Sequence, residues 1–248
     1  MRLFGAGWTD IGLHRRSNED SFAAVQQDIS TGRQDACYAV CDGLGGARAG
    51  EVASRTAVDA FVTVWFSEDV TAETAQRRVR LAVQEANAAV HARSLSSASM
   101  AGMGTTLVGL VSHAGWAYIC SVGDSRCYRL RTGTLKQITQ DHTVAAEMAR
   151  QGLLNHCSAP DVAERNLLTR VVGTSSHVEA DVVADELRCG DRYLLCSDGL
   201  WSAVTETDLL TALAGGAVNE SARRLVDLAN AAGGLDNSTA IVIEVQSG

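Results

Sequence analysis

The feature that most constrains this chain is an apolar run that ends on an aspartate and a glycine, and that occurs twice. YAVCDGLGG spans residues 38–46, and YLLCSDGL spans residues 193–200. Such a run predicts a buried strand, and a bare carboxylate at the tip of a buried strand has no packing role. A bound cation would compensate for the charge, so Asp42 and Asp198 are candidate metal ligands.

The order of the predicted elements favours antiparallel sheets. Short strand-like segments follow one another through turns rich in glycine and aspartate. Apolar residues at helical spacing predict helices over residues 49–66 and 71–97, and shorter helices near 143–152, 205–214 and 219–234. Because strands and helices do not alternate regularly, a parallel sheet is not expected. We expect an α+β fold in which a central β-sandwich of two antiparallel sheets is flanked by α-helices, a four-layer αββα arrangement.

Length and composition favour one domain. The chain has 248 residues, 46% of them hydrophobic, which is enough to bury a sizeable core. Its single proline, Pro160, lies in no linker, and no glycine-serine or charged stretch divides the sequence. We therefore expect residues 1–248 to form a single domain.

Charge and cysteine usage exclude several classes of function. The formal net charge is −8 and no cluster of lysines and arginines forms a basic face, so no nucleic-acid partner is expected. The seven cysteines include no CxxC pair and lie mostly in apolar runs, which favours free thiols in a reducing compartment. No apolar run approaches the roughly 18 residues of a membrane span, and the N-terminus lacks a secretory apolar region. A cytoplasmic protein without membrane association is expected.

Acidic residues lie beside several of the predicted strands. Besides Asp42 and Asp198, they are Glu19 with Asp20, Asp124 and Asp236. Oxygen ligands favour Mg²⁺ or Mn²⁺, and no histidine-cysteine cluster has the spacing of a zinc site. Two such cations can clamp the oxygens of a displacement at phosphorus. Arg15 and Arg16, just before Glu19, could hold a phosphate with their guanidinium groups.

Seven segments, in order, resemble the metal-dependent Ser/Thr protein phosphatases of type 2C, the PPM family, in their bacterial single-domain form. They are RRSNEDSF, VCDGLGGARAGEVAS, GMGTTL, SVGDSRCYRL, ITQDHT, LLCSDGLW and LDNSTAIVIEV. The resemblance implies hydrolysis of phosphoserine and phosphothreonine in proteins by direct attack of a water or hydroxide that bridges two metals, Mn²⁺ or Mg²⁺. It also implies phosphorylated protein partners that are substrates of a bacterial Ser/Thr kinase, and a mobile flap at about residues 143–170. We expect the protein to be a monomer.

The resemblance assigns the core metal ligands. Asp42 would bridge the two metals, and the Gly43 carbonyl would bind one of them. Asp198 and Asp236 would complete the first site.

Further roles are implied around that core. Glu19, supported by Asp20, would hold waters on the second metal, and Asp124 would help to bind a third metal. Asn237 would orient the Asp236 carboxylate, and Arg15 would grip the phosphate.

Three questions stay open at the level of sequence. Leu44 stands where many eukaryotic members of the family carry a histidine proposed as general acid, so metal-bound water or His142 would supply that proton. Cys120 and Arg126 have the C-x5-R spacing of cysteine-dependent phosphatases, although a strand rather than a helix is predicted to follow. A catalytically inactive module that senses phosphoproteins is a further alternative, but such a module would be expected to lose metal ligands.

Overall fold

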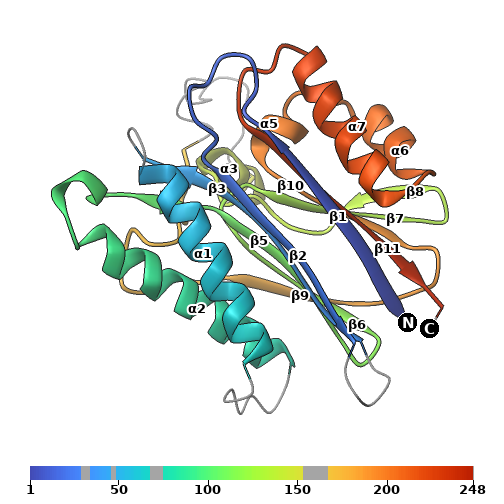
Figure 1. Cartoon of the computed structure of the whole chain (residues 1–248), viewed down its shortest axis with the longest axis horizontal. Helices are drawn as coiled ribbons and strands as arrows, with labels where there is room; N and C mark the ends of the chain where they lie inside the picture. The colour runs from blue at the N-terminus through green and yellow to red at the C-terminus, as the bar shows by residue number, and fades with distance from the viewer. Residues whose placement is uncertain (29–33, 46–48, 68–74, 153–166, 248) are drawn as a thin grey trace.

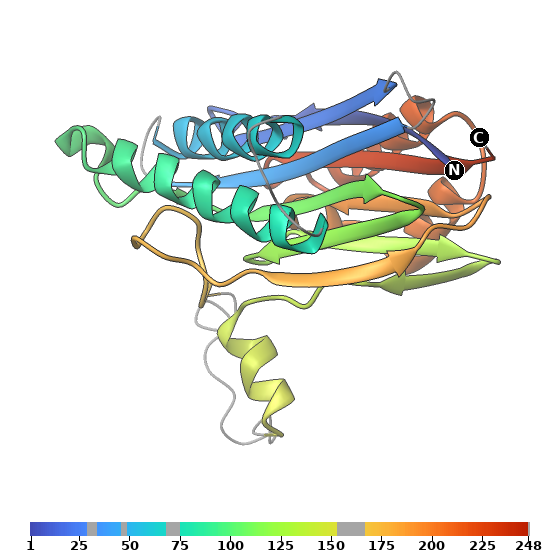
Figure 2. The ribbon, with the colours of Figure 1, turned by 90° about the horizontal axis from the view of Figure 1, so that it is seen from below.

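The computed structural model describes residues 1–28, 34–45, 49–67, 75–152 and 167–247. Its strands form two antiparallel sheets stacked face to face (Figures 1 and 2). In chain order they are β1 (Arg2–Asp10), β2 (Asp20–Asp28), β3 (Gln34–Leu44), β4 (Gly104–Thr105), β5 (Leu107–His113), β6 (Trp116–Val122), β7 (Arg126–Arg131), β8 (Thr134–Gln137), β9 (Asp181–Glu186), β10 (Arg192–Cys196) and β11 (Ser238–Gln246). Sheet 1 has the order β1-β11-β10-β7-β8, and sheet 2 has the order β2-β3-β5-β6-β9, with β4 paired to β3.

The helices cover the outer faces of the two sheets. They are α1 (Ala49–Phe66), α2 (Ala75–Ser94), α3 (Val144–Arg150), α5 (Asp198–Trp201), α6 (Glu206–Leu213) and α7 (Val218–Ala231), with a 3-10 turn, η1, at Ala98–Met100. Helices α1 and α2 pack on sheet 2, while α6 and α7 pack on sheet 1 (Figure 1). The predicted αββα layers are therefore confirmed.

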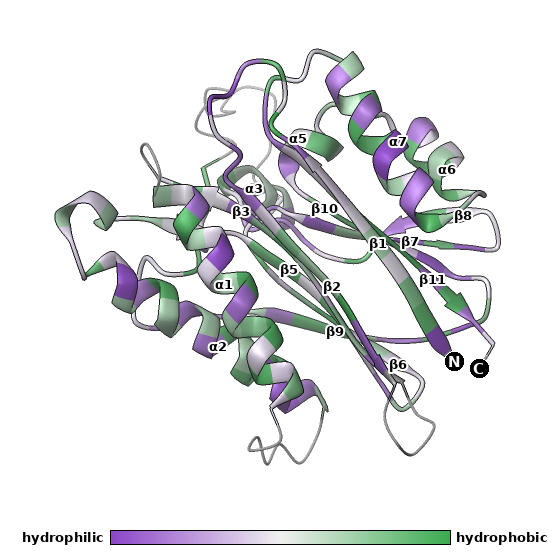
Figure 3. Cartoon of the chain, viewed as in Figure 1, coloured by the Kyte–Doolittle hydropathy of each residue, from purple (hydrophilic) through white to green (hydrophobic). Residues whose placement is uncertain are grey.

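Three buried clusters fill the spaces between the four layers. Phe61 and Trp65 belong to the cluster between α1, α2 and sheet 2. Tyr38 and Tyr193 belong to the cluster between the sheets, and Leu225 to the one beneath α6 and α7. The middle strands are apolar over much of their length, whereas the helices alternate between apolar and polar residues (Figure 3). Burial of both faces of each sheet explains why the strands read as apolar runs rather than as alternating patterns.

Most elements follow the sequence-based prediction. Helix α1 has the predicted bounds, and the predicted apolar stripe of α2 is buried at Val79, Val83, Ala86 and Val90. Helix α6 begins as expected, since the Thr205 hydroxyl accepts a hydrogen bond from the backbone N–H of Asp208. Of the strands and α-helices that the structure describes, the N-terminal strand β1 and the one-turn helix α5 that begins at Asp198 were not predicted.

Strand β1 was not predicted because two glycines, Gly5 and Gly7, weaken its strand-like sequence pattern. The structure shows that both face aromatic rings of sheet 2. A Cβ at position 5 would lie 2.3 Å from Cε1 of Tyr38, and one at position 7 would lie 2.4 Å from Cε2 of Phe22. The glycines therefore allow the two sheets to approach where these rings fill the space between them.

Of the segment 143–170 predicted as a flap, residues 153–166 lie outside the described residues. The part before them contains α3, which projects away from the sheets (Figure 2). Thr143 caps α3 by accepting a hydrogen bond from the backbone N–H of Ala146 at 3.2 Å. Among the helices of the described residues, none has the length and apolar character that crossing a membrane requires.

Gly5→Ala should destabilise the fold by about 1–3 kcal/mol, because the new methyl group would overlap the fully buried Tyr38 ring. Gly215→Ala is the matched control, since nothing lies within 4 Å of a Cβ at that position. Its effect should stay within about 0.5 kcal/mol. Urea unfolding measures both changes, and equal stability of the two variants would contradict the close sheet contact at Gly5.

Candidate metal centre

A cavity of about 220 Å³ opens where several strands end. Asp20 at the start of β2 pairs with Asp42 near the end of β3, and the end of β10 pairs with the start of β11. Antiparallel pairing thus brings acids that are far apart in the sequence to one edge of the sandwich. The cavity is lined by Arg15, Glu19, Asp42, Gly43, Leu44, Gly45, Asp198, Asp236 and Asn237. Of the predicted site residues, only Asp20 and Asp124 are outside this lining.

The backbone of Asp42 is fixed by two threonines. Strand β3 continues two residues past Asp42, and the Asp42 N–H donates to Oγ1 of Thr106 at 2.9 Å. The Asp42 carbonyl accepts from Oγ1 of Thr105 at 2.8 Å and from the N–H of Thr106 at 2.9 Å. The carboxylate therefore projects from a rigid main chain. Sequence reasoning included both threonines in the segment GMGTTL but gave them no function.

Gly43 lies in a space that admits no side chain. A Cβ there would be 2.1 Å from the carbonyl oxygen of Gly50 at the start of α1. The Gly43 N–H donates to the carbonyl oxygen of Glu19 at 3.1 Å, which joins β3 to the segment before β2. The glycine predicted to offer a carbonyl ligand is thus also required for the packing of α1 against β3.

Asp20 is buried beneath the cavity and connects three strands. Its Oδ2 accepts hydrogen bonds from Oγ of Ser197 at 2.7 Å and from Oγ1 of Thr239 at 2.6 Å. Burial raises the pKa of Asp20 to about 7, although the two hydroxyl groups act in the opposite direction. Because Ser197 directly precedes Asp198, Asp20 fixes the segment that carries Asp198. The Asp20 side chain was predicted to support Glu19, but these hydrogen bonds join it to Ser197 and Thr239.

Asn237 acts on the site through two different groups. Its backbone N–H donates to Oδ1 of Asp236 at 2.8 Å, so the predicted contact with that carboxylate is made by the main chain. Its side-chain oxygen accepts from the N–H of Glu19 at 2.8 Å, and its side-chain nitrogen donates to the carbonyl of Ile11 at 2.9 Å. The Asn237 side chain therefore holds the β1–β2 connection against the start of β11.

The ionised form of the carboxyl groups around the cavity is unfavourable. Burial, followed by the charges of Asp20 and Asp198, holds the pKa of Asp42 well above its usual range. Burial also raises the pKa values of Asp198 and Glu19. Oδ1 of Asp198 is buried and has no hydrogen-bond partner among the described residues. A polar atom in this position is costly unless something outside the described chain binds it.

These groups fit a hard divalent cation. The lining offers carboxylate and backbone carbonyl oxygens, the ligands that Mg²⁺ and Mn²⁺ prefer. Within the described ranges, no three Asp, Glu, His or Cys side chains already meet at one point. The carboxylates surround the cavity instead, as expected for like charges that burial forces into the same region.

Arg15 pairs with one of these acids. Its Nη2 lies 2.6 Å from Oδ2 of Asp236, and the two side chains are 50% and 33% exposed. An ion pair this exposed is worth about 1 kcal/mol or less, so an anion in the cavity can compete for the guanidinium. Arg16 does not line the cavity.

Asp124 lies outside the cavity lining but close to Asp198. It is nearly buried, and burial, with the charges of Asp198 and Asp141, raises its pKa to about 7. The structure therefore places this acid next to the candidate site without adding it to the cavity wall.

Cys120 is unsuited to act as a nucleophile. It lies fully buried within β6, opposite Gly109 of β5, and burial raises the pKa of its thiol to about 12. A thiolate is the reactive form of cysteine, and this environment suppresses it. The segment after it enters strand β7 at Arg126, so no helix N-terminus is available there to hold a phosphate.

His142 is equally unsuited to be a general acid. It is fully buried, and its Nδ1 accepts a hydrogen bond from the N–H of Gly123 at 3.1 Å. Its Nε2 lies 3.2 Å from Oδ2 of Asp181, and burial lowers the pKa of the imidazole. Both ring nitrogens are therefore engaged within the protein, away from the cavity.

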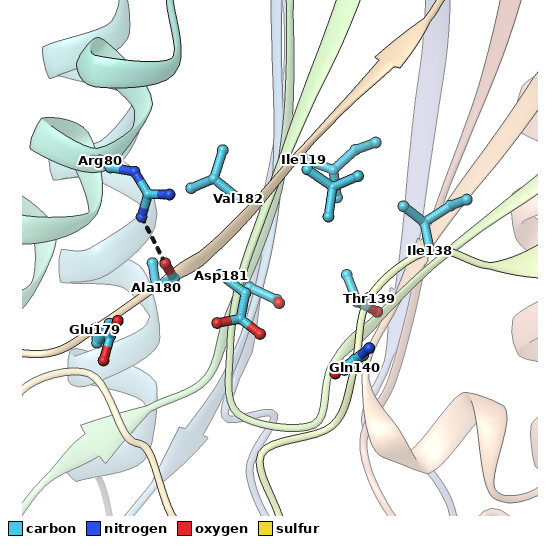
Figure 4. Close-up of a pocket in the computed structure, with 11 residues that line it drawn as sticks. Arg80, Ile119, Ile138, Thr139, Gln140, Glu179, Ala180, Asp181 and Val182 are labelled. Atoms are coloured by element: carbon cyan, nitrogen blue, oxygen red, sulfur yellow. Dashed lines mark hydrogen bonds between the residues drawn. The ribbon is translucent and has the colours of Figure 1, made fainter. Parts of the chain in front are cut away.

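A larger hollow, of about 330 Å³, lies between β9, β6 and the segment after β8 (Figure 4). Arg80 at its wall donates to the carbonyl of Ala180 at 3.0 Å. Asp181 accepts from Nη1 of Arg170 at 2.9 Å and faces His142. Arg80 and Asp181 thus have partners within the protein, whereas Oδ1 of Asp198 has none among the described residues, and the acid-lined cavity remains the stronger candidate site.

Comparison with known proteins gives consistent results. The sequence model of the family described as "Protein phosphatase 2C" matches residues 14–232. The chain is 35% identical over 239 residues to "Serine/threonine phosphatase stp" of Listeria welshimeri, covering 95% of this chain and 93% of that protein. It is 37% identical over 240 residues to "Serine/threonine protein phosphatase PstP" of Mycobacterium tuberculosis, covering 97% of this chain but 44% of that protein. The PstP catalytic domain, solved in complex with two manganese ions, superposes with a TM-score of 0.84 at 36% identity, covering 99% of each chain.

The raised pKa of Asp124 predicts a pH-dependent effect of Asp124→Asn in the metal-free protein. The ordinary pKa of aspartate is about 3.9, so between about pH 4 and pH 7 the unfolded chain releases this proton more readily than the folded chain. The wild-type protein should therefore lose stability relative to the variant as pH rises, by up to about 1.4 kcal/mol per pH unit.

Urea unfolding in chelator at several pH values within this window measures the difference. Glu244→Gln is the control, because hydrogen bonds from Gln246 and Arg192 lower the pKa of Glu244, the opposite direction to that of Asp124. A stability difference between wild type and Asp124→Asn that stays constant from about pH 5 to pH 7 would contradict the assigned environment.

Proposed function

The chain belongs to the protein phosphatase 2C family, and we propose that its acid-lined cavity is the active site of a serine/threonine phosphatase that depends on Mn²⁺ or Mg²⁺. Its reaction is the hydrolysis of phosphoserine and phosphothreonine in proteins. The observation that carries this assignment is that Arg15, Asp42, Asp198 and Asp236, drawn from four parts of the sequence, line the same cavity.

The carboxylates are the groups that would hold the cations. Asp42, with the Gly43 carbonyl, Asp198 and Asp236, is suited to the core position, and Glu19 lies on the same cavity wall. Bound divalent cations lower the pKa of a water molecule and offset negative charge on phosphate oxygens. The protein's own part is to fix the acids, through Thr105 and Thr106 at the Asp42 backbone and through Ser197 and Thr239 at Asp20.

Arg15 is suited to bind the phosphoryl group. Its side chain lies at the cavity, half exposed, and a guanidinium can donate two parallel hydrogen bonds to phosphate oxygens. Its present partner, Asp236, would then be free for a cation. Arg15 can also offset charge that develops on the transferred group, because the donor is in position before the reaction.

The substrates proposed are proteins phosphorylated on serine or threonine, with a bacterial Ser/Thr kinase as the source of the phosphate. We place the reaction in the cytoplasm, in keeping with the buried free cysteines and the absence of a spanning helix among the described residues. Residues 1–248 would act as one catalytic domain and as a monomer, because the three cores draw on elements from the whole described chain.

Two alternatives are less well supported. The burial of Cys120 argues against a cysteine-dependent phosphatase. An inactive sensing module would be expected to lack some of the acids, whereas all those predicted for the core line the cavity.

Activity on a phosphate ester should disappear in excess chelator and return with Mn²⁺ or Mg²⁺. Asp42→Asn should reduce kcat/KM by more than about 10-fold, equivalent to about 1.4 kcal/mol, because its carboxylate lines the cavity and feels the charges of both Asp198 and Asp124. Steady-state assays across a range of Mn²⁺ concentrations measure both effects. Full activity in chelator, or an Asp42→Asn enzyme as active as wild type, would overturn the proposed function.

Arg15→Ala should lower kcat/KM while the affinity for Mn²⁺ is retained, since arginine contributes donors to phosphate but no ligand to a cation. Arg16→Ala is the matched control: it removes the same charge from the neighbouring position, which does not line the cavity. Kinetics with a small phosphate ester and calorimetric Mn²⁺ titration separate the two properties. A larger loss for Arg16→Ala than for Arg15→Ala would show that the phosphate-binding arginine is misassigned.

A further inference from the structure

The turn that carries Asp124 is bound to the helix that begins with Asp198. Trp201 is the last residue of that one-turn helix, α5. Its indole Nε1–H donates to the carbonyl oxygen of Asp124 at 2.9 Å. A direct hydrogen bond therefore joins the backbone of one acid to the short helix that holds the other.

The Trp201 ring is itself fixed from one face. Cζ of Arg126 lies 3.4 Å from the ring centroid, a close cation–π contact. Arg126 is held in turn by Asp141, with Nε to Oδ1 at 3.0 Å and Nη2 to Oδ2 at 2.7 Å, and Nη1 donates to the Tyr128 hydroxyl at 2.9 Å. The Arg126 and Asp141 side chains are only 19% and 13% exposed. A paired and stacked guanidinium restricts the orientation of the indole.

The other side of the same turn is held by His142. The backbone N–H of His142 donates to the carbonyl of Gly123 at 2.9 Å, and Nδ1 of its ring accepts from the Gly123 N–H at 3.1 Å. Gly123 has a φ of +96°, which suits glycine and few other residues. Ser125 is bonded to Thr106, the residue that also binds Asp42, at 2.8 Å between hydroxyl oxygens. The turn is thus held at the Gly123 peptide groups, at the Asp124 carbonyl and at the Ser125 hydroxyl.

We propose that Trp201 is a positioning residue that fixes Asp124 beside Asp198, and that its indole N–H strengthens cation binding by this pair of acids. The inference rests on the proposed function in one respect, that these carboxylates bind divalent cations. Partners that orient metal ligands typically contribute about 10–100-fold to metal affinity. Trp201 approaches Asp124 through the backbone, so its effect would pass through the position of the turn.

Trp201→Phe is the test, because it retains an aromatic ring under Arg126 and removes the N–H donor. Calorimetric titration of Mn²⁺ into the metal-free protein should show the ion that Asp124 helps to bind losing about 10-fold or more in affinity. Asp124→Asn should weaken the same ion. In the double variant the loss should be no greater than in Asp124→Asn alone, because both changes act on one ligand.

Tyr128→Phe is the matched control within the same cluster. It removes the hydroxyl that accepts from Arg126, but it leaves the Asp141 pairing and the Trp201 hydrogen bond in place. It should alter thermal stability without altering Mn²⁺ affinity. If Trp201 had a purely structural role, Trp201→Phe would, like Tyr128→Phe, bind Mn²⁺ with the same isotherm as wild type.

The outcomes are separable. A wild-type protein that binds no Mn²⁺ would overturn the proposed function itself. Normal Mn²⁺ binding by Trp201→Phe, or additive losses in the double variant, would overturn this inference alone. If Trp201→Phe does not fold, Arg126→Gln tests the same arrangement, since it frees the indole without removing its N–H. Unchanged Mn²⁺ affinity in Arg126→Gln would then contradict the proposal.

Discussion

The main physical constraint on the site is the repulsion between carboxylates that the antiparallel sheets bring to one edge. Asp20 and Asp42 occupy paired positions on β2 and β3, and Asp198 begins a helix directly after β10. Burial and mutual repulsion raise the pKa of Asp42, and they do the same for Asp124 near Asp198. This arrangement stores unfavourable energy unless protons or cations compensate for it. The catalytic requirement for metal and the electrostatics of the fold thus have the same physical origin.

The rest of the site restrains these acids without neutralising them. Hydroxyl groups from Thr105, Thr106 and Ser197 bind backbone atoms or the buried Asp20, while Oδ1 of Asp198 has no hydrogen-bond partner in the part of the chain that the structure describes. The backbone is thus anchored while carboxylate oxygens stay available. This arrangement is expected of metal ligands in a metal-free protein. Arg15 adds the only lining side chain, among those described, with a fixed positive charge, and it is exposed enough to exchange Asp236 for an anion.

The sequence allowed the prediction of the layers and of most cavity residues because both leave local signals. Apolar runs that end on Asp-Gly indicated Asp42 and Asp198, and helical periodicity gave the bounds of α1. Strand β1 could not be predicted in this way, because Gly5 is explained only by the Tyr38 ring on the opposite sheet. The contact between Trp201 and Asp124, which are 77 residues apart, likewise depends on packing that no local pattern reveals. His142 was a candidate general acid by residue type alone, and its full burial depends on packing that the sequence does not show.

The most direct test of this account is whether cation binding displaces protons from the acid cluster. Mn²⁺ would be titrated calorimetrically into the metal-free protein near pH 6.5, in two buffers with different ionisation enthalpies. Because Asp20 and Asp124 have pKa values of about 7 and that of Asp42 is raised well above its usual range, binding should release protons, and the heats should differ between buffers. Binding with identical heats in both buffers, or no binding, would contradict the claim that cations complete this cluster.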